Sequence, residues 1–190
     1  MKGTYTLIIL VPRETTVRVG KLGRYSLDRG LYLYTGSARG RGSSSLEGRI
    51  KRHLSGRKKA FWHIDYLLSA NRATVLDVVY SSDRTISECN VNRDISSKIN
   101  GSIIIGHFGS SDCHCLTHLL RAPQDVVARD LAKQITSIYG LAGTTAVLNL
   151  QRSNIRRVRR RSYPMRESKR QLPQRRSGYC AVDEVLPETT

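Results

Sequence analysis

Residues 30–54 decide the fold of this chain; they read GLYLYTGSARGRGSSSLEGRIKRHL. The first part, residues 30–36, alternates Leu and Tyr between glycines, which is typical of a β-strand with defined ends. A loop of Gly, Ser and Arg follows over residues 37–45. From residue 46 an aliphatic side chain recurs at every fourth position, which predicts a helix over residues 46–54 with one apolar stripe.

This helix is expected to begin at a serine and to carry two basic side chains on one face. Ser44 or Ser45 can accept a hydrogen bond from the free amide groups of the first turn, as N-cap residues do. Arg49 and His53 are four residues apart, so they project from the same side of the helix. Because an arginine on an amphipathic helix is most often solvated surface, this pair does not define a site by itself.

Further strands and helices surround this unit. They are expected as strands over 4–11, 15–19 and 73–80, a short buried strand over 103–105, and helices over 62–68 and 87–99. Glu88 falls in the first turn of the last helix, where the helix dipole favours a carboxylate. Together these elements predict an α/β (α+β) domain over residues 1–120, with a small central antiparallel sheet flanked by helices.

The chain changes character after Pro123. Apolar positions over residues 126–138 have helical spacing, and the glycines of 140–143 interrupt the pattern before a second apolar segment at 146–150. We therefore expect a further helix in this part of the chain.

The C-terminal third is expected to be an appendage of the domain. We expect a helical extension over 121–161, in which a helix–turn–helix over 124–161 is an alternative that the pattern does not decide. A flexible tail over 162–190, basic and then acidic, would follow. Eleven of the 32 Lys and Arg residues lie between Arg152 and Arg176, a density typical of a solvated arm.

The charge of the chain points to a polyanionic partner. With 32 Lys and Arg against 15 Asp and Glu, the net charge is +17, and such a surface binds phosphates with release of their counterions. We expect nucleic acid and no membrane, since no long amphipathic basic helix is expected in the globular part. The apolar run of residues 7–11 is too short for a spanning helix or a signal peptide, so we expect a cytoplasmic protein with reduced cysteines.

Several stretches resemble one known family. They are Gly-Thr-Tyr at 3–5, Val-Gly-Lys-Leu-Gly at 19–23, Gly-Leu-Tyr-Leu-Tyr-Thr-Gly-Ser-Ala at 30–38, Arg49 with His53, Trp-His-Ile-Asp-Tyr-Leu at 62–67, Glu88-Cys89, and Phe-Gly-Ser-Ser-Asp-Cys-His-Cys at 108–115. On these residues, positions 3–118 resemble a GIY-YIG nuclease domain of the compact subfamily that also occurs fused to endonuclease III. The two tyrosine motifs lie further apart than in the wider superfamily, and a hairpin through 21–23 accounts for this. Ser44 and Ser45 stand where a glycine is expected before the arginine helix.

The resemblance implies an active site with one divalent cation. Glu88 would hold Mg²⁺ or Mn²⁺, and Arg49 would bind the scissile phosphate. Tyr34 or Tyr5 would orient the attacking water, and His53 would contact the phosphate or carry a proton. A phenol with an ordinary pKa of about 10 is a poor base at neutral pH, so it would need help from the metal ion and Arg49.

Contacts with nucleic acid are expected from basic residues around this site and from the arm. The residues are Lys21, Arg39, Arg41, Arg52, Lys58, Lys59, Arg156, Arg157, Arg159, Arg160 and Arg161. Arginines of the arm would add affinity without reading the sequence, and this affinity would depend strongly on salt.

A second group of polar residues has two interpretations. Cys113, Cys115 and His118 could supply three ligands of a tetrahedral zinc site, with Cys89 as a fourth. The spacing is shorter than that of zinc ribbons. We therefore favour the alternative, in which Cys89 packs in the core and Asp112 forms a hydrogen-bonded corner with His114 or His118. In the neighbouring helix, His63 and Asp65 are expected on different faces, with Trp62 in the core and His63 near the cleft.

The sequence thus predicts a divalent-metal-dependent endonuclease that hydrolyses phosphodiester bonds, of DNA rather than RNA. One alternative is a nucleic-acid-binding module of the same fold that does not cleave and acts as a repair accessory. Another is an interaction domain stabilised by zinc.

Overall fold

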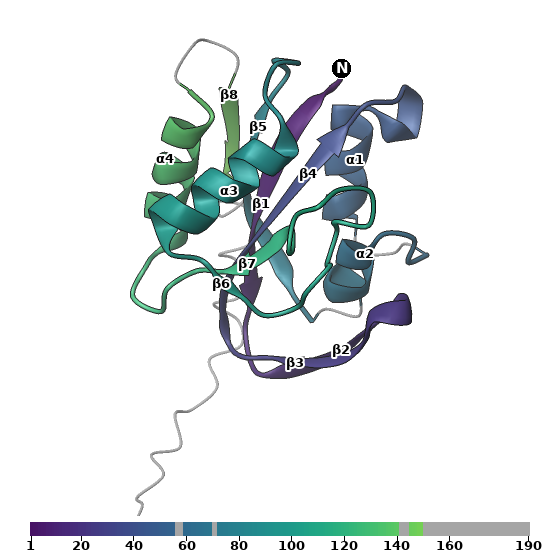
Figure 1. Ribbon diagram of the computed structural model, residues 1–190, viewed down its shortest axis with the longest axis vertical. Coiled ribbons are helices and arrows are strands. Elements are labelled where there is room, and N and C mark those ends of the chain that lie inside the picture. The colour runs from purple at the N-terminus through teal and green to yellow at the C-terminus, as the bar shows by residue number, and fades with distance from the viewer. Residues whose placement is uncertain (56–58, 70–71, 141–144, 150–190) are drawn as a thin grey trace, which may run out of the picture.

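A six-stranded antiparallel sheet forms the centre of the molecule in the computed structural model, which describes residues 1–55, 59–69, 72–140 and the backbone of 145–149 (Figure 1). In spatial order its strands are β6 (Ser102–Ile103), β7 (Leu119–Arg121), β4 (Gly30–Ala38), β1 (Gly3–Val11), β5 (Thr74–Ser81) and β8 (Thr145–Asn149). Each neighbouring pair is antiparallel. The predicted α+β fold with a central antiparallel sheet and flanking helices is confirmed.

Two helices cover each face of this sheet. The helices α1 (Leu46–Leu54) and α2 (His63–Leu68) pack on the face to which β1 contributes Tyr5 and Leu7. The helices α3 (Glu88–Ile99) and α4 (Ala128–Ile138) pack on the opposite face, around Ile8 (Figure 1). Because strand side chains alternate between faces, β1 supplies both cores and is buried on both sides.

The hairpin after β1 forms a separate small sheet. Its strands β2 (Thr15–Val19) and β3 (Gly23–Leu27) are antiparallel and are joined by the 3-10 turn η1 (Gly20–Leu22). The hairpin predicted through 21–23 is therefore confirmed, but its first strand pairs with 23–27 and is not a member of the central sheet. Val17, Val19 and Leu27 still join the core under α2.

The start of α1 follows the sequence prediction. The 3-10 turn η2 (Gly42–Ser44) leads into Ser45, whose side chain accepts a hydrogen bond from Gly48 N at 3.1 Å. A cap of this kind stabilises a helix by about 1 kcal/mol. It fixes the direction in which α1 leaves β4, and so it fixes the position of Arg49.

The region after residue 120 differs from the prediction in two ways. Helix α4 packs through Leu131 and Ile135 into the same core as α3, so residue 120 is not a boundary between packed units. Residues 145–149 form strand β8 beside β5, so the part of the predicted extension that the structure describes is not wholly helical. Residues 150–190, with the arm and tail, lie outside the described residues.

The edge of the sheet explains a further correction. The predicted buried strand over 103–105 is instead the two-residue strand Ser102–Ile103, and both of its residues are exposed. Strand β6 is an edge strand that pairs with β7 alone, so its side chains face solvent; Ile105, just beyond it, is the buried residue. Among the described residues, no helix has the length and apolar character needed to span a membrane.

Candidate functional site

A cleft of about 630 Å³ brings together three of the predicted catalytic residues. Tyr34 enters it from β4, Arg49 from α1 and Glu88 from the first turn of α3. Two predicted neighbours, Arg39 and His118, also line it. Residues that are far apart in the sequence therefore share one cavity, as the motif order predicted.

Strand pairing places both tyrosines beneath the cleft. In the β1–β4 register Tyr5 lies opposite Gly36 and Leu7 lies opposite Tyr34, so both tyrosine rings are on the α1 side of the sheet. Gly36 leaves the space that the Tyr5 ring fills, since a Cβ at this position would stand 2.7 Å from the Tyr5 Oη. Only Tyr34 lines the cleft; Tyr5 is buried behind it.

Burial controls the ionisation of both phenols. Desolvation raises the pKa of Tyr5 above its ordinary value of 10.0, and the positive charge of Arg49 opposes this only in part. Desolvation raises the pKa of Tyr34 as well, and Glu88 adds to the rise. Both phenols are therefore protonated at neutral pH, and their chemistry is that of hydrogen-bonding groups rather than bases.

Arg49 has an unused hydrogen-bond donor. Its guanidinium carbon lies 4.5 Å above the centroid of the Trp62 ring, a cation–π arrangement that orients the side chain. Its Nε is shielded from solvent and has no hydrogen-bond partner among the described residues. A buried donor without a partner costs about 1–3 kcal/mol, so an anion in the cleft would relieve this cost.

His53 and Arg52 do not face the cleft in the way that was predicted. His53 is 3% exposed, and its Nε2 lies 2.8 Å from the Tyr5 Oη. Its Nδ1 lies 3.9 Å from Oδ1 of the buried Asp65. Arg52 donates to Asp65 Oδ2 at 2.8 Å. His53 and Asp65 are buried behind Tyr5, so His53 positions Tyr5 rather than contacting a phosphate. Arg52 is half-buried and is engaged by Asp65 and by Lys59 O.

Asp65 was missed as an organising residue by the sequence prediction. Its Oδ2 also accepts the backbone amides of Phe61 and Trp62, each at 3.1 Å, and so it caps the start of α2. Its expected separation from His63 holds, because Asp65 faces Arg52 while His63 faces the turn before β7. No sequence signal distinguishes this buried aspartate from an ordinary first-turn acid.

His63 lines the cleft, as predicted, and it fixes the opposite wall. Its Nδ1 accepts a hydrogen bond from Gly109 N at 3.0 Å, so in the neutral ring Nε2 carries the proton. Burial lowers the pKa of His63 below 6.5. Gly109 has a φ of +75°, and a Cβ there would stand 2.9 Å from the Tyr34 ring, which explains why this turn needs glycine.

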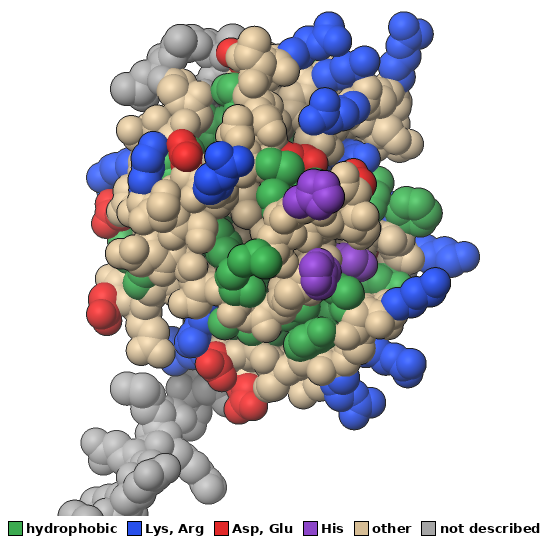
Figure 2. Space-filling model, viewed as in Figure 1, with side chains coloured by type: hydrophobic (Ala, Val, Ile, Leu, Met, Phe, Trp, Pro, Cys, Tyr) green, Lys and Arg blue, Asp and Glu red, His purple; other side chains and the backbone are tan. Residues whose placement is uncertain are grey.

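Of the other basic residues, Arg39, Arg41, Lys21 and Lys59 are exposed, but only Arg39 lines the cleft. Lys and Arg side chains gather over the η2–α1 end and around the hairpin and α2 (Figure 2). The remaining predicted contacts, Lys58 and Arg156, Arg157, Arg159, Arg160 and Arg161, lie outside the described residues. Asp112 and Phe61, which is 77% exposed, also line the cleft and were not predicted to do so. Trp62 was expected in the core, but it is half-buried and lines the cleft.

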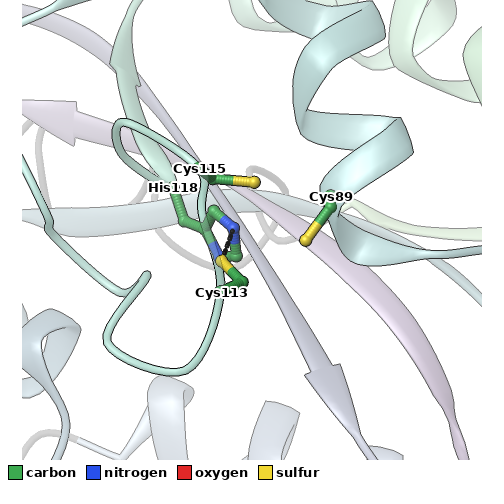
Figure 3. Close-up of side chains that lie close together, drawn as sticks. All are labelled: Cys89, Cys113, Cys115 and His118. Atoms are coloured by element: carbon green, nitrogen blue, oxygen red, sulfur yellow. Dashed lines mark hydrogen bonds between the residues drawn. The ribbon is translucent and has the colours of Figure 1, made fainter.

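Beside the cleft, four side chains cluster and could bind a metal ion. The ligand atoms of Cys89, Cys113, Cys115 and His118 all lie within 4.8 Å of one another (Figure 3). Cys113 Sγ lies 3.5 Å from His118 Nε2. Burial and the neighbouring thiols raise the pKa of Cys115 to about 12. The favoured prediction that Cys89 packs in the core is wrong, because its thiol faces this group and is only partly buried.

The fold and the cleft therefore define an α+β domain with a polar cavity at one end of a central antiparallel sheet. The model of one family, described as domain of unknown function DUF123, matches residues 4–140. The chain belongs to this family. The matched range includes α4, in agreement with its packing on the same core. Searches of curated proteins and of solved structures gave no match.

Proposed function

We propose that this protein is a divalent-metal-dependent endonuclease, similar to the GIY-YIG nucleases, that hydrolyses phosphodiester bonds of nucleic acid in the cleft, with DNA as the favoured substrate. The observation that carries the proposal is the meeting of Tyr34, Arg49 and Glu88 in one cavity. These residues provide a hydroxyl oxygen that can accept a hydrogen bond from an attacking water, a cation for a phosphate and a carboxylate for a metal ion. The basic surface around the cleft supports a polyanionic substrate.

Glu88 and Asp112 fit the needs of Mg²⁺ or Mn²⁺. Both carboxylates line the cleft, and hard cations of this kind are held by one or two carboxylates while they keep several waters. A bound ion would supply charge neutralisation at a phosphate oxygen and a more acidic water.

The side chains of the chain itself have separable roles in hydrolysis. Arg49 would donate to the non-bridging phosphate oxygens, which satisfies its buried Nε. Tyr34 would hold the attacking water by hydrogen bonding, because its raised pKa keeps the phenol protonated. The protonated Nε2 of His63 would donate to a phosphate, and the exposed Phe61 ring offers a stacking surface for a base.

The test is a cleavage assay on supercoiled plasmid, single-stranded DNA, branched DNA and RNA, with Mg²⁺, Mn²⁺ or EDTA. Arg49→Ala and Glu88→Gln are expected to reduce cleavage by about 100-fold or more, the usual effect of removing charge stabilisation at a transition state. Lys51→Ala on α1 and Asp94→Asn on α3 are matched controls, since Lys51 is exposed, the Asp94 side chain is 46% exposed, and neither residue lines the cleft. Cleavage that survives both site substitutions would refute the site.

A second function is a binding module that does not cleave. The unused donor of Arg49 and the basic surface would serve binding equally well. Salt-sensitive binding to nucleic acid, weakened by Arg49→Ala and without cleavage in either metal, would favour this function.

The Cys/His cluster calls for a different ion. Three thiols and one imidazole are soft donors, which suit zinc and do not suit Mg²⁺. We therefore propose zinc as the ion of this cluster.

A further inference from the structure

The Cys/His cluster joins two segments that are separate in the sequence. Cys89 belongs to the first turn of α3, whereas Cys113, Cys115 and His118 belong to the turn that precedes β7. In Figure 3 the three sulfur atoms and the imidazole face a common space between these segments. A set of donors that converge from two segments is the arrangement of a structural metal site.

The distances suit a tetrahedral ion. With zinc bonds of about 2.3 Å to sulfur and about 2.0 Å to nitrogen, adjacent ligand atoms lie about 3.5–3.8 Å apart. The distance between Cys113 Sγ and His118 Nε2 is 3.5 Å, which agrees with the separation expected of two zinc ligands. Because all four ligand atoms are within 4.8 Å of one another, shifts of about 1 Å would complete the set.

The same two segments carry one wall of the cleft. Glu88 directly precedes Cys89, and Asp112 directly precedes Cys113. His118 belongs to both the cluster and the cleft lining. Within the described residues, a direct polar link between the segments is the hydrogen bond that Asn92 Nδ2 donates to Thr117 O at 2.7 Å.

We infer that one zinc ion binds Cys89, Cys113, Cys115 and His118 and clamps the start of α3 to the turn of residues 107–118. The clamp holds Glu88 and Asp112 in place on their wall of the cleft. The ion site stands independently of the proposed hydrolysis, and only the effect of the clamp on cleavage depends on it. This ion is structural, since all four positions are filled by protein ligands.

The first test is metal content. Protein purified without an affinity tag in reducing buffer is expected to contain one zinc per chain. Cys115→Ser and His118→Ala are expected to lose it. His114→Ala is the matched control and should retain it, because His114 lies between two of these residues in the sequence but is not in the cluster. Zinc-free wild-type protein, or full zinc in Cys115→Ser, overturns the site.

A second variant distinguishes loss of a zinc ligand from loss of zinc through misfolding. Cys115→His restores a fourth donor and is expected to keep zinc, and cobalt in its place should give the absorption of a tetrahedral thiolate complex. Failure of Cys115→His to bind either ion while the protein remains folded overturns the assignment of Cys115 as a ligand.

The clamp has its own readout. Removal of zinc by a chelator is expected to speed amide hydrogen exchange at least tenfold over residues 88–92 and 107–118, and to leave the β1–β4 pair unchanged. The melting temperature should fall by about 10 °C, as expected when a tightly bound ligand is lost. Loss of zinc with unchanged exchange in both segments overturns the clamp. A zinc-bound, clamped protein that cuts no substrate overturns the proposed hydrolysis alone.

Discussion

Substitution of Gly36 by alanine tests the packing on which the tyrosine side of the cleft depends. The added Cβ would stand 2.7 Å from the Tyr5 Oη and 2.8 Å from its Cζ, and 3.3 Å from Cε1 of Tyr34. Neither ring can move away freely. Tyr5 is 1% exposed, and its hydroxyl is held by His53 at 2.8 Å.

The expected loss follows from these contacts. Overpacking of a rigid core costs about 1–3 kcal/mol, and with two contacts below 3 Å we expect about 2 kcal/mol for Gly36→Ala. For a chain of this size that corresponds to a fall in melting temperature of about 4–8 °C. Tyr5→Phe in the same chain removes the hydroxyl contact but leaves Cζ, so it should relieve only part of the loss.

Thermal unfolding followed by circular dichroism measures this effect. Gly106→Ala is the control, because a Cβ at Gly106 meets no atom within 4 Å, and it should change the melting temperature little. If Gly36→Ala melts with the wild type, the Tyr5 ring does not occupy the space opposite Gly36, and the placement of both tyrosines is wrong.

Four further outcomes are expected. Arg52→Ala should lower the melting temperature, because Arg52 is paired with the buried carboxylate of Asp65. Arg39→Ala should instead lower the affinity for nucleic acid in a filter-binding assay, because Arg39 is exposed in the cleft. Burial lowers the pKa of His63, so the folded protein resists its protonation and stability falls as the pH drops below about 6.5; the melting temperature of His63→Asn should therefore fall less between pH 7.5 and 5.5. Deletion of the chain from residue 152 removes the arm, and it should weaken binding and flatten the slope of log K against log salt.

Local patterns explain why the central elements could be predicted from the sequence. The strands β1 and β4 and the helix α1 have strong periodicity and clear ends, at Pro12 and at Ser45. The strands β7 and β8 have no such signal, because a strand as short as Leu119–Arg121 is defined by its pairing with β4 rather than by its composition. For the same reason a second apolar segment after α4 could be taken for part of a helical extension.

The site residues, like the strands, include some that a sequence pattern predicts and some that only the packing reveals. Tyr34, Arg49 and Glu88 were predicted because their motif order resembles a family, whereas no local pattern reveals that Asp65 is buried. An aspartate can be buried when partners compensate its charge, and here the partners are Arg52 and two backbone amides. Sequence spacing also does not predict that the Cys/His cluster forms, because it is the packing of α3 that brings Cys89 to the other three side chains.

The two walls of the cleft are held by different chemistry. Behind Tyr34 and Arg49 lie the buried hydrogen bond between Tyr5 and His53 and the carboxylate of Asp65, 3.9 Å from His53 Nδ1. At the start of α3 the Ser87 N-cap side chain makes no hydrogen bond to the helix, and the hydrogen bonds are those of Thr4 to Ile86 O and of Asn92 to Thr117 O. In the proposed hydrolysis Glu88 would hold a cation against a phosphate, and this role needs a fixed position. The inferred zinc clamp would supply this position by joining the start of α3, which already packs through Val91 and Ile95, to the turn before β7.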